Sequence, residues 1–150
     1  SGNPPGLSVD RDGTRINFGF GLMKSIDGGA TWTNVNPGGA FTGLAINSIL
    51  IYPEDPNVML LTTGRGTGTG QVWRSTDAGD TWSPVLTGAV ATDWCGLAFS
   101  ATFGNGERFL YAVGESGSGG QVWRSGDRGG NWQQLTLPFI NPNQNSLDIA

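Results

Sequence analysis

An eight-residue segment occurs three times in this 150-residue sequence, at a constant spacing of 50 residues. The copies read SIDGGATW from residue 25, STDAGDTW from residue 75 and SGDRGGNW from residue 125. The residues just before them also correspond, because QVWRS begins at both residue 71 and residue 121 and LMKS occupies 22–25. Three equally spaced copies indicate an internal repeat, in which each unit buries its apolar surface against its neighbours.

Each copy has the pattern of a hairpin tip. The apolar run before it predicts a strand whose alternate side chains face the core. The Asp at the third position can accept hydrogen bonds from backbone N–H groups of the turn, and the Gly two residues later supplies the positive φ that such turns need. The Trp at the last position buries a large area and holds the register of the return strand. We expect a structural role for the Asp and Trp residues of the motif, which are Asp27, Trp32, Asp77, Trp82, Asp127 and Trp132.

The repeat also defines a map of short strands. The first unit is predicted at 7–10, 15–20, 22–25 and 31–35, the second at 47–52, 58–63, 71–75 and 81–86, and the third at 96–100, 108–114, 121–125 and 131–135. Turn-forming residues separate the strands, and no stretch shows helical periodicity. The fold class is therefore all-β, with four strands in each unit and units at about 7–42, 43–92 and 93–142.

Composition excludes several classes of function. The chain has no His and a single Cys, so it lacks a Ser-His-Asp or Cys-His nucleophile system, a His-based metal site, an internal disulfide and a zinc cluster. A net charge of −4 argues against nucleic-acid binding, and no apolar run approaches the roughly 20 residues of a membrane span. We expect no metal, cofactor, nucleic acid or membrane partner.

The motif resembles the Asp-box, also called the BNR repeat, on the residues Ser-x-Asp-x-Gly-x-Thr-Trp. That repeat occurs in sialidases, sortilin-type receptors, photosystem assembly factors and xyloglucan-cleaving glycoside hydrolases, where it forms the hairpin between the third and fourth strands of a β-propeller blade. Segments 51–58 and 135–139 resemble the xyloglucan-cleaving hydrolases further, and the third copy departs from the pattern at Gly126 and Asn131. The resemblance covers essentially the whole chain and implies a β-propeller of four-stranded antiparallel blades.

Three predicted blades do not close a ring, because propellers typically contain 4 to 8 of them. Residues 145–150 resemble the strand predicted at 47–52 and are expected to form the first strand of a further blade. An isolated monomer would expose blade faces and a sheet edge, so we expect further copies of this chain, or another chain, to complete the propeller. A Ser at the first position and the lack of a recognisable signal peptide predict a processed or excised product.

In propellers with this repeat, ligands meet the end opposite the motif turns. The segments predicted at that end are 36–42, 64–70, 87–95, 114–120 and 138–144. Glu115 and Asp93 are the acidic residues placed there and are the candidate catalytic residues, with a solvated loop acid or a turn cap as the alternative. Glycoside hydrolysis needs two carboxyl groups, roughly 5 Å apart for retention or roughly 6.5–9.5 Å for inversion. No catalytic Asp can be transferred from the resembled hydrolases, because the matching places hold 62–64 (Thr-Thr-Gly) and 113–115 (Val-Gly-Glu).

Two further residues are candidates for substrate binding. Trp94 lies outside the repeated positions, in a segment expected to join two blades, and an exposed indole there would stack on a sugar ring. Packing between blades is the alternative for Trp94. Arg65 is a candidate for an anionic sugar, although the arginine cluster and the Arg-Ile-Pro segment of sialidases are absent from the sequence. Cys95 is expected to be a buried small hydrophobe.

The sequence favours a carbohydrate-facing propeller module with a polysaccharide or oligosaccharide ligand. If the module is catalytic, the resemblance implies a glycoside hydrolase of the xyloglucanase type. The alternative is a non-catalytic self-assembling or recognition unit, in which two or more chains complete the ring. A chain with 26 Gly and a single Lys suits an extracellular protein that meets neutral polymers, so secretion is expected.

Overall fold

The computed structural model describes residues 7–9, 15–17, 21–64, 69–88, 91–117 and 119–136. The strands are β1 (Leu7–Val9), β2 (Arg15–Asn17), β3 (Met23–Lys24), β4 (Thr33–Asn34), β5 (Ile46–Ile51), β6 (Met59–Thr63), β7 (Gln71–Ser75), β8 (Ser83–Thr87), β9 (Thr92–Phe99), β10 (Leu110–Ser116), β11 (Gly119–Ser125) and β12 (Gln133–Leu135). One 3-10 turn, η1 (Pro37–Gly39), is the helical element among the described residues, and none of them forms a helix able to cross a membrane. The predicted all-β class is confirmed.

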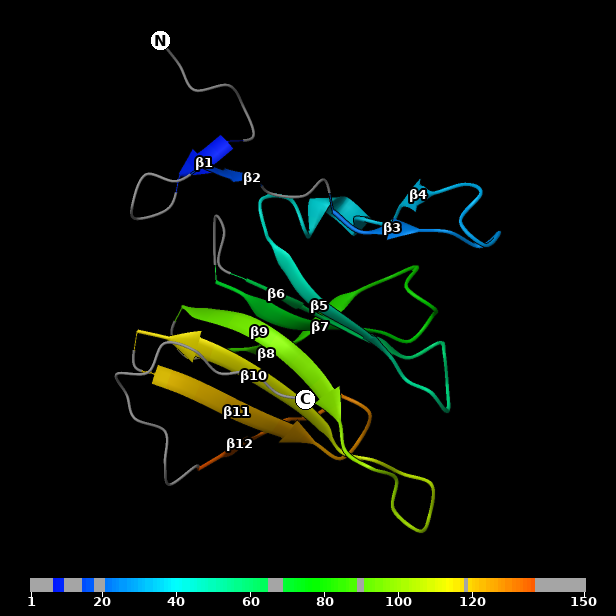
Figure 1. Ribbon diagram of the computed structural model, residues 1–150, viewed down its shortest axis with the longest axis vertical. Coiled ribbons are helices and arrows are strands. Elements are labelled where there is room, and N and C mark those ends of the chain that lie inside the picture. Colours follow the sequence, from blue (N-terminus) through cyan, green and yellow to red (C-terminus); the bar gives the residue numbers. More distant parts are fainter. Residues whose placement is uncertain are drawn as a thin grey trace.

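Two four-stranded antiparallel sheets form the body of the molecule. Their strand orders are β5-β6-β7-β8 and β9-β10-β11-β12, so each sheet follows the order of the sequence. The two sheets pack on one another, with β9 against β5 and β6 (Figure 1). Successive four-stranded meanders stacked in this way have the architecture of neighbouring propeller blades.

The main apolar core lies between these two sheets. It includes Leu60 and Val72 from the second unit and Trp94, Leu110 and Ala112 from the third. Each of these side chains is buried. Alternate residues of a strand point to the same face of its sheet, so one strand can place several side chains between the two sheets. The stability of either sheet therefore depends on contact with the other.

A second core joins the first unit to the second. Phe41, from the segment between β4 and β5, is fully buried beside Leu61, Trp73 and Trp82. Its ring meets Trp73 edge-on at 5.2 Å between centroids and Trp82 at 6.1 Å. Such edge-to-face pairs contribute about 0.5–1.5 kcal/mol beyond area burial, so this connecting segment anchors the two units together.

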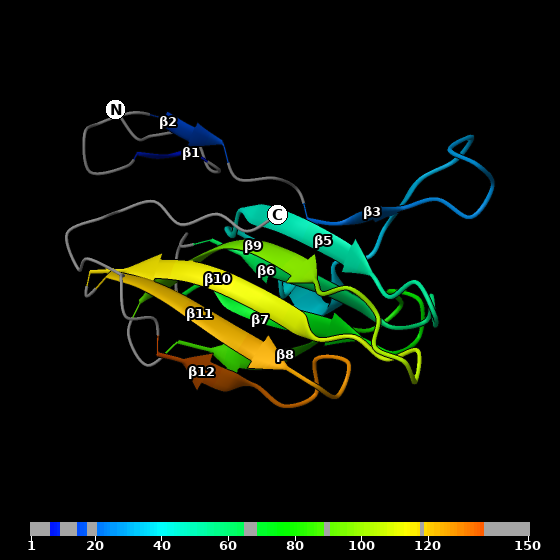
Figure 2. The same cartoon turned by 60° about the horizontal axis from the view of Figure 1, so that its bottom comes forward.

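The first unit differs from the four-stranded blade predicted for it. Within the described residues, β1 pairs only with β2 and β3 only with β4, giving two separate two-stranded sheets. The β3–β4 hairpin extends away from the larger sheets (Figure 2). Among the described residues no preceding unit packs on this hairpin, and Trp32 is 59% exposed whereas the equivalent Trp82 is 7% exposed. The strand predicted at 145–150 lies outside the described residues and stays a prediction.

The three motif turns, defined as residues 25–32, 75–82 and 125–132, connect the third and fourth strands of their units. Their hydrogen bonds correspond. In the second turn the Ser75 hydroxyl donates to Asp77 Oδ1 at 2.7 Å and accepts from the Gly79 N–H at 2.8 Å. Thr81 N donates to Asp77 Oδ1 at 2.8 Å, and Trp82 Nε1 donates to the Gly79 carbonyl at 3.0 Å. The other two turns repeat this network, with Asn131 in place of Thr in the third.

The backbone of the motif turns needs two successive left-handed residues. Gly29, Gly79 and Gly129 have φ of 93°, 85° and 81°, as the sequence predicts. The preceding position is also left-handed, although it holds Ala78 (φ 57°) in the second turn and Arg128 (φ 59°) in the third. A non-glycine residue costs roughly 1–2 kcal/mol there, and the hydrogen-bond network offsets that cost.

The same network lowers the pKa of the motif carboxylates. Donation from the Thr81 hydroxyl, then from the Thr81 backbone N–H and from Ser75, lowers the pKa of Asp77 from its ordinary 3.8 to about 2. Asp27 has the same causes in Thr31 and Ser25 and the same pKa of about 2. For Asp127, burial would raise the pKa, but the bonds from Asn131 and Ser125 outweigh it and leave it at about 2.

The lowered pKa values predict acid sensitivity. A carboxylate whose pKa is lower in the folded chain stabilises that chain fully above the ordinary pKa of 3.8, and the contribution is lost as the pH falls toward about 2. Asp77→Asn should lower the thermal midpoint at pH 7 and flatten its decline between pH 5 and 2, measured by circular dichroism. The exposed Glu107→Gln is the control. Parallel pH profiles for Asp77→Asn and the unmodified chain would contradict the network.

Gly129 should tolerate a methyl group less well than Gly79. Both have φ near +80°, so alanine incurs the same backbone strain of roughly 1–2 kcal/mol at each. At Gly129 the new Cβ would also lie 2.5 Å from Leu60 Cδ2, which is fully buried, whereas at Gly79 the nearest atom is Met59 Sδ at 3.4 Å. Gly129→Ala should therefore reduce the free energy of unfolding by about 1–3 kcal/mol more than Gly79→Ala. Equal losses in urea denaturation would show that the Leu60 contact is easily relieved.

Candidate functional site

Asp93 and Glu115 are neighbours across two paired strands. The sequence placed both in loops, and the structure corrects this, because β9 begins at Thr92 and β10 continues to Ser116. The strands extend through a glycine-rich stretch since pairing uses backbone groups that every glycine also carries. In this register Asp93 lies directly opposite Glu115, so both side chains leave the same face of the sheet.

The Asp93 carboxylate lies at the seam between the second and third units. Its Oδ1 occupies the space that a side chain at Gly64, just after β6, would fill. Asn47 Nδ2, from β5, is 3.5 Å from that oxygen and donates to the Trp94 carbonyl at 2.8 Å. Residues from three strand ends therefore meet around one carboxylate.

Glu115 is held in a less favourable environment. Its Oε2 is buried and accepts no hydrogen bond from the described residues. On its other side Glu115 faces Gly120 of β11, which has no side chain to contact it. A carboxylate oxygen that is shielded from solvent without a hydrogen bond, opposite a second acidic residue, opposes folding. Arrangements that cost stability in this way concentrate at functional sites.

The structure corrects the interpretation of Trp94 as an exposed sugar platform. Trp94 lies inside β9 and is fully buried, and its Nε1 donates to the Gly70 carbonyl at 3.1 Å. Gly70 N donates in turn to the Thr92 carbonyl at 3.0 Å. An indole with no exposed face cannot stack on a sugar, so Trp94 serves as the packing contact between the second and third units.

The remaining site predictions have different outcomes. Arg65 lies outside the described residues and stays a prediction. Cys95 is half-buried, and its Sγ donates to the Asp93 carbonyl at 3.4 Å. Asn47 is a site residue that the sequence did not indicate, since nothing local marks it and only the packing of β5 beside β9 brings it to Asp93. No group of three or more metal-ligating side chains occurs in the part of the chain that the structure describes.

Comparison with known proteins supports the fold. No protein-family model and no curated protein matches the sequence. Among solved structures, the chain is similar to the crystal structure of the GH74 xyloglucanase from Xanthomonas campestris, with a TM-score of 0.57 and 21% sequence identity. The match covers 91% of this chain and 23% of that one, so this chain spans less than a quarter of the xyloglucanase. At this identity the likeness supports a propeller-like fold.

The opposed carboxylates predict a stability gain on neutralisation. Like charges directly across an antiparallel pair destabilise it by roughly 0.2–1 kcal/mol. Glu115→Gln should therefore raise the free energy of unfolding at pH 7 by about that amount, and Asp93→Asn should add less in the Glu115→Gln background than alone. Urea denaturation of the four chains measures this coupling, with Glu107→Gln as the matched surface control. Additive effects would mean that the two side chains do not interact.

Proposed function

We propose that this chain is a carbohydrate-facing β-propeller module, in which Asp93 and Glu115 meet the sugar with help from Asn47. The observation that carries the proposal is the cross-strand pairing of the two acidic residues beside that amide. Carboxylate and amide groups supply the acceptors and donors that sugar hydroxyls need. The likeness to a xyloglucanase supports a sugar ligand, and we infer that the motif turn is the Asp-box of such propellers.

The same pair defines a reaction class. One carboxylic acid protonates the glycosidic oxygen, while the other carboxylate either attacks the sugar carbon or activates a water that does so. Asp93 and Glu115 supply these two carboxyl groups from directly opposite positions on one face of the sheet. The substrate class is a β-linked glucan such as xyloglucan, and the protein is secreted.

Binding and cleavage test the proposal separately. Titration calorimetry with xyloglucan oligosaccharides should show binding that Asp93→Asn and Glu115→Gln each weaken by about tenfold or more, since a lost charge-assisted hydrogen bond is worth roughly 1.5–3 kcal/mol. Release of reducing ends from soluble xyloglucan should disappear in both variants. Glu107→Gln, in the loop between β9 and β10, should behave as the unmodified chain. Unchanged binding in both site variants would refute this site.

A non-catalytic recognition or assembly unit is the second candidate. Three apolar side chains, Met23, Ile49 and Ile51, are about half exposed and border a hollow of about 220 Å³ beside Trp82. Exposed apolar groups that cluster in this way mark interaction surfaces. Saturable binding of a partner without binding of any glucan would favour this function over the first.

A further inference from the structure

The strands that begin the second and third units each carry a β-bulge at the end where Asp93 lies. The register of β5 with β6 shifts between Ile46 and Ser48, which leaves Asn47 as the extra residue. The register of β9 with β10 shifts in the same region, and Cys95 is the extra residue there. A bulge turns its side chains away from the regular alternation and is over-represented next to active sites. The two bulges therefore indicate that this end of the junction is shaped for a function beyond strand pairing.

The bulge in β5 directs the Asn47 side chain across the junction to the third unit. Its Nδ2 donates to the Trp94 carbonyl at 2.8 Å and lies 3.5 Å from Asp93 Oδ1. A backbone carbonyl only accepts hydrogen bonds, so the amide nitrogen of Asn47, not its oxygen, must face β9. The short bond uses one of the two N–H groups, and the second N–H is available to the Asp93 carboxylate. Hydrogen bonds at such sites are often long without substrate and tighten when it binds.

Gly64, which directly follows β6, leaves the space in which these two side chains meet. A Cβ at this position would overlap Asp93 Oδ1 and would lie 2.9 Å from Asn47 Nδ2. The φ of Gly64 is not in the left-handed region, so its backbone would accept alanine without that strain. The chain therefore has a glycine where its backbone does not require one and where the contact between Asn47 and Asp93 does.

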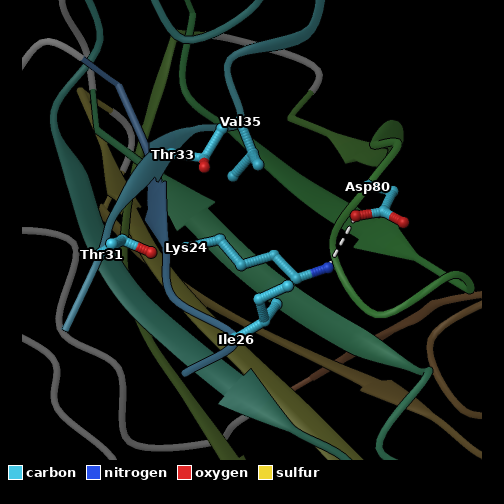
Figure 3. Close-up of a pocket in the computed structure, with 6 residues that line it drawn as sticks. All are labelled: Lys24, Ile26, Thr31, Thr33, Val35 and Asp80. Carbon is cyan, nitrogen blue, oxygen red and sulfur yellow. Dashed lines mark hydrogen bonds and ion pairs between the residues drawn. The ribbon is translucent and has the colours of Figure 1, made fainter. Parts of the chain in front are cut away.

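Other contacts hold the units together at the end where the motif turns lie. Between the second and third units, Arg108 donates to Glu54 Oε1 from Nε at 3.0 Å and from Nη2 at 2.7 Å. Between the first and second units, Lys24 Nζ donates to Asp80 Oδ1 at 2.6 Å (Figure 3). The placement of the third unit on the second therefore does not rest on Asn47, and changes at Asn47 can be tested in a folded chain.

We propose that Asn47 is a positioning residue, which is anchored on the Trp94 carbonyl and fixes the orientation of the Asp93 carboxylate, while Gly64 keeps the space for that contact open. The inference rests on the proposed function, in which Asp93 meets the sugar. A carboxylate that is already oriented loses less freedom when a ligand binds, and such preorganisation raises affinity. Because Asn47 belongs to the second unit and Asp93 to the third, the site is assembled by the stacking of two units.

Gly64→Ala tests the positioning without removing either side chain. The new methyl group displaces two flexible side-chain ends, so the thermal midpoint should stay within about 2–4 °C of that of the control Gly104→Ala. In that control no described atom beyond the neighbouring residues lies within 4 Å of the new methyl group. Binding of xyloglucan oligosaccharides, measured by titration calorimetry, should weaken by about tenfold in Gly64→Ala, as expected for a lost hydrogen bond to a charged group. Equally tight binding by the two variants would overturn the positioning role.

Asn47→Ala removes the same contact from the other side. It should weaken oligosaccharide binding about as much as Gly64→Ala does, and the two changes together should weaken it no further, because groups in one contact are not additive. Circular dichroism checks that each variant is folded. Two independent losses that add would overturn the proposal, since Asn47 and Gly64 would then act on different parts of the site.

The side-chain amide resonances of Asn47 report the contact without any sugar. In the nuclear magnetic resonance spectrum of the full chain, they should move toward their positions in an unstructured chain in Asp93→Asn and in Gly64→Ala, and should keep their positions in Gly104→Ala. If the unmodified chain binds no oligosaccharide, the proposed function fails, and these resonances then decide whether Asn47 holds Asp93. Resonances that respond to neither Asp93→Asn nor Gly64→Ala would overturn the contact, whether or not the chain binds sugar.

Discussion

The hydrogen-bonded motif turn is the interaction on which the rest of the structure depends. One Asp carboxylate and one Ser hydroxyl satisfy the backbone N–H groups of a turn that contains two left-handed residues. Without those bonds, the strain at Ala78 and Arg128 would be uncompensated. The turn also fixes where the motif Trp enters the apolar core, and Trp82 packs there with Phe41 and Trp73. A network of eight residues therefore sets both the path of the chain and a large part of the core.

Contacts between units provide the second level of organisation. Trp94 bonds to the Gly70 carbonyl, Phe41 is buried beside Trp73 and Trp82, and Leu60 covers Gly129. Each contact joins one unit to the next, as in other repeat architectures whose stability is a sum of unit and interface contributions. The candidate sugar site lies at such a junction, between the second and third units.

The junction between the second and third units combines a stable and an unstable part. The packed side of β9 presents Trp94, which is fully buried and hydrogen-bonded. The adjacent residue, Asp93, faces Glu115, whose Oε2 is buried without a hydrogen bond from the described residues. A buried, hydrogen-bonded side chain beside an unsatisfied acidic group is the arrangement expected where a protein loses some stability in order to bind a ligand.

The sequence by itself determined the all-β class, through its alternating apolar residues, and the three motif turns, whose hydrogen bonds lie within eight residues. The four-stranded blade that it predicted for the first unit does not form among the described residues. Only the tertiary structure decided the site. Asn47 meets Asp93 from 46 residues away, and the extension of β10 through Gly114 to Glu115 depends on backbone pairing, which a glycine-rich sequence does not display. Burial of Trp94 was likewise fixed by the packing of one unit on the next. Local hydrogen bonds leave a sequence pattern, whereas contacts between units depend on how the units stack.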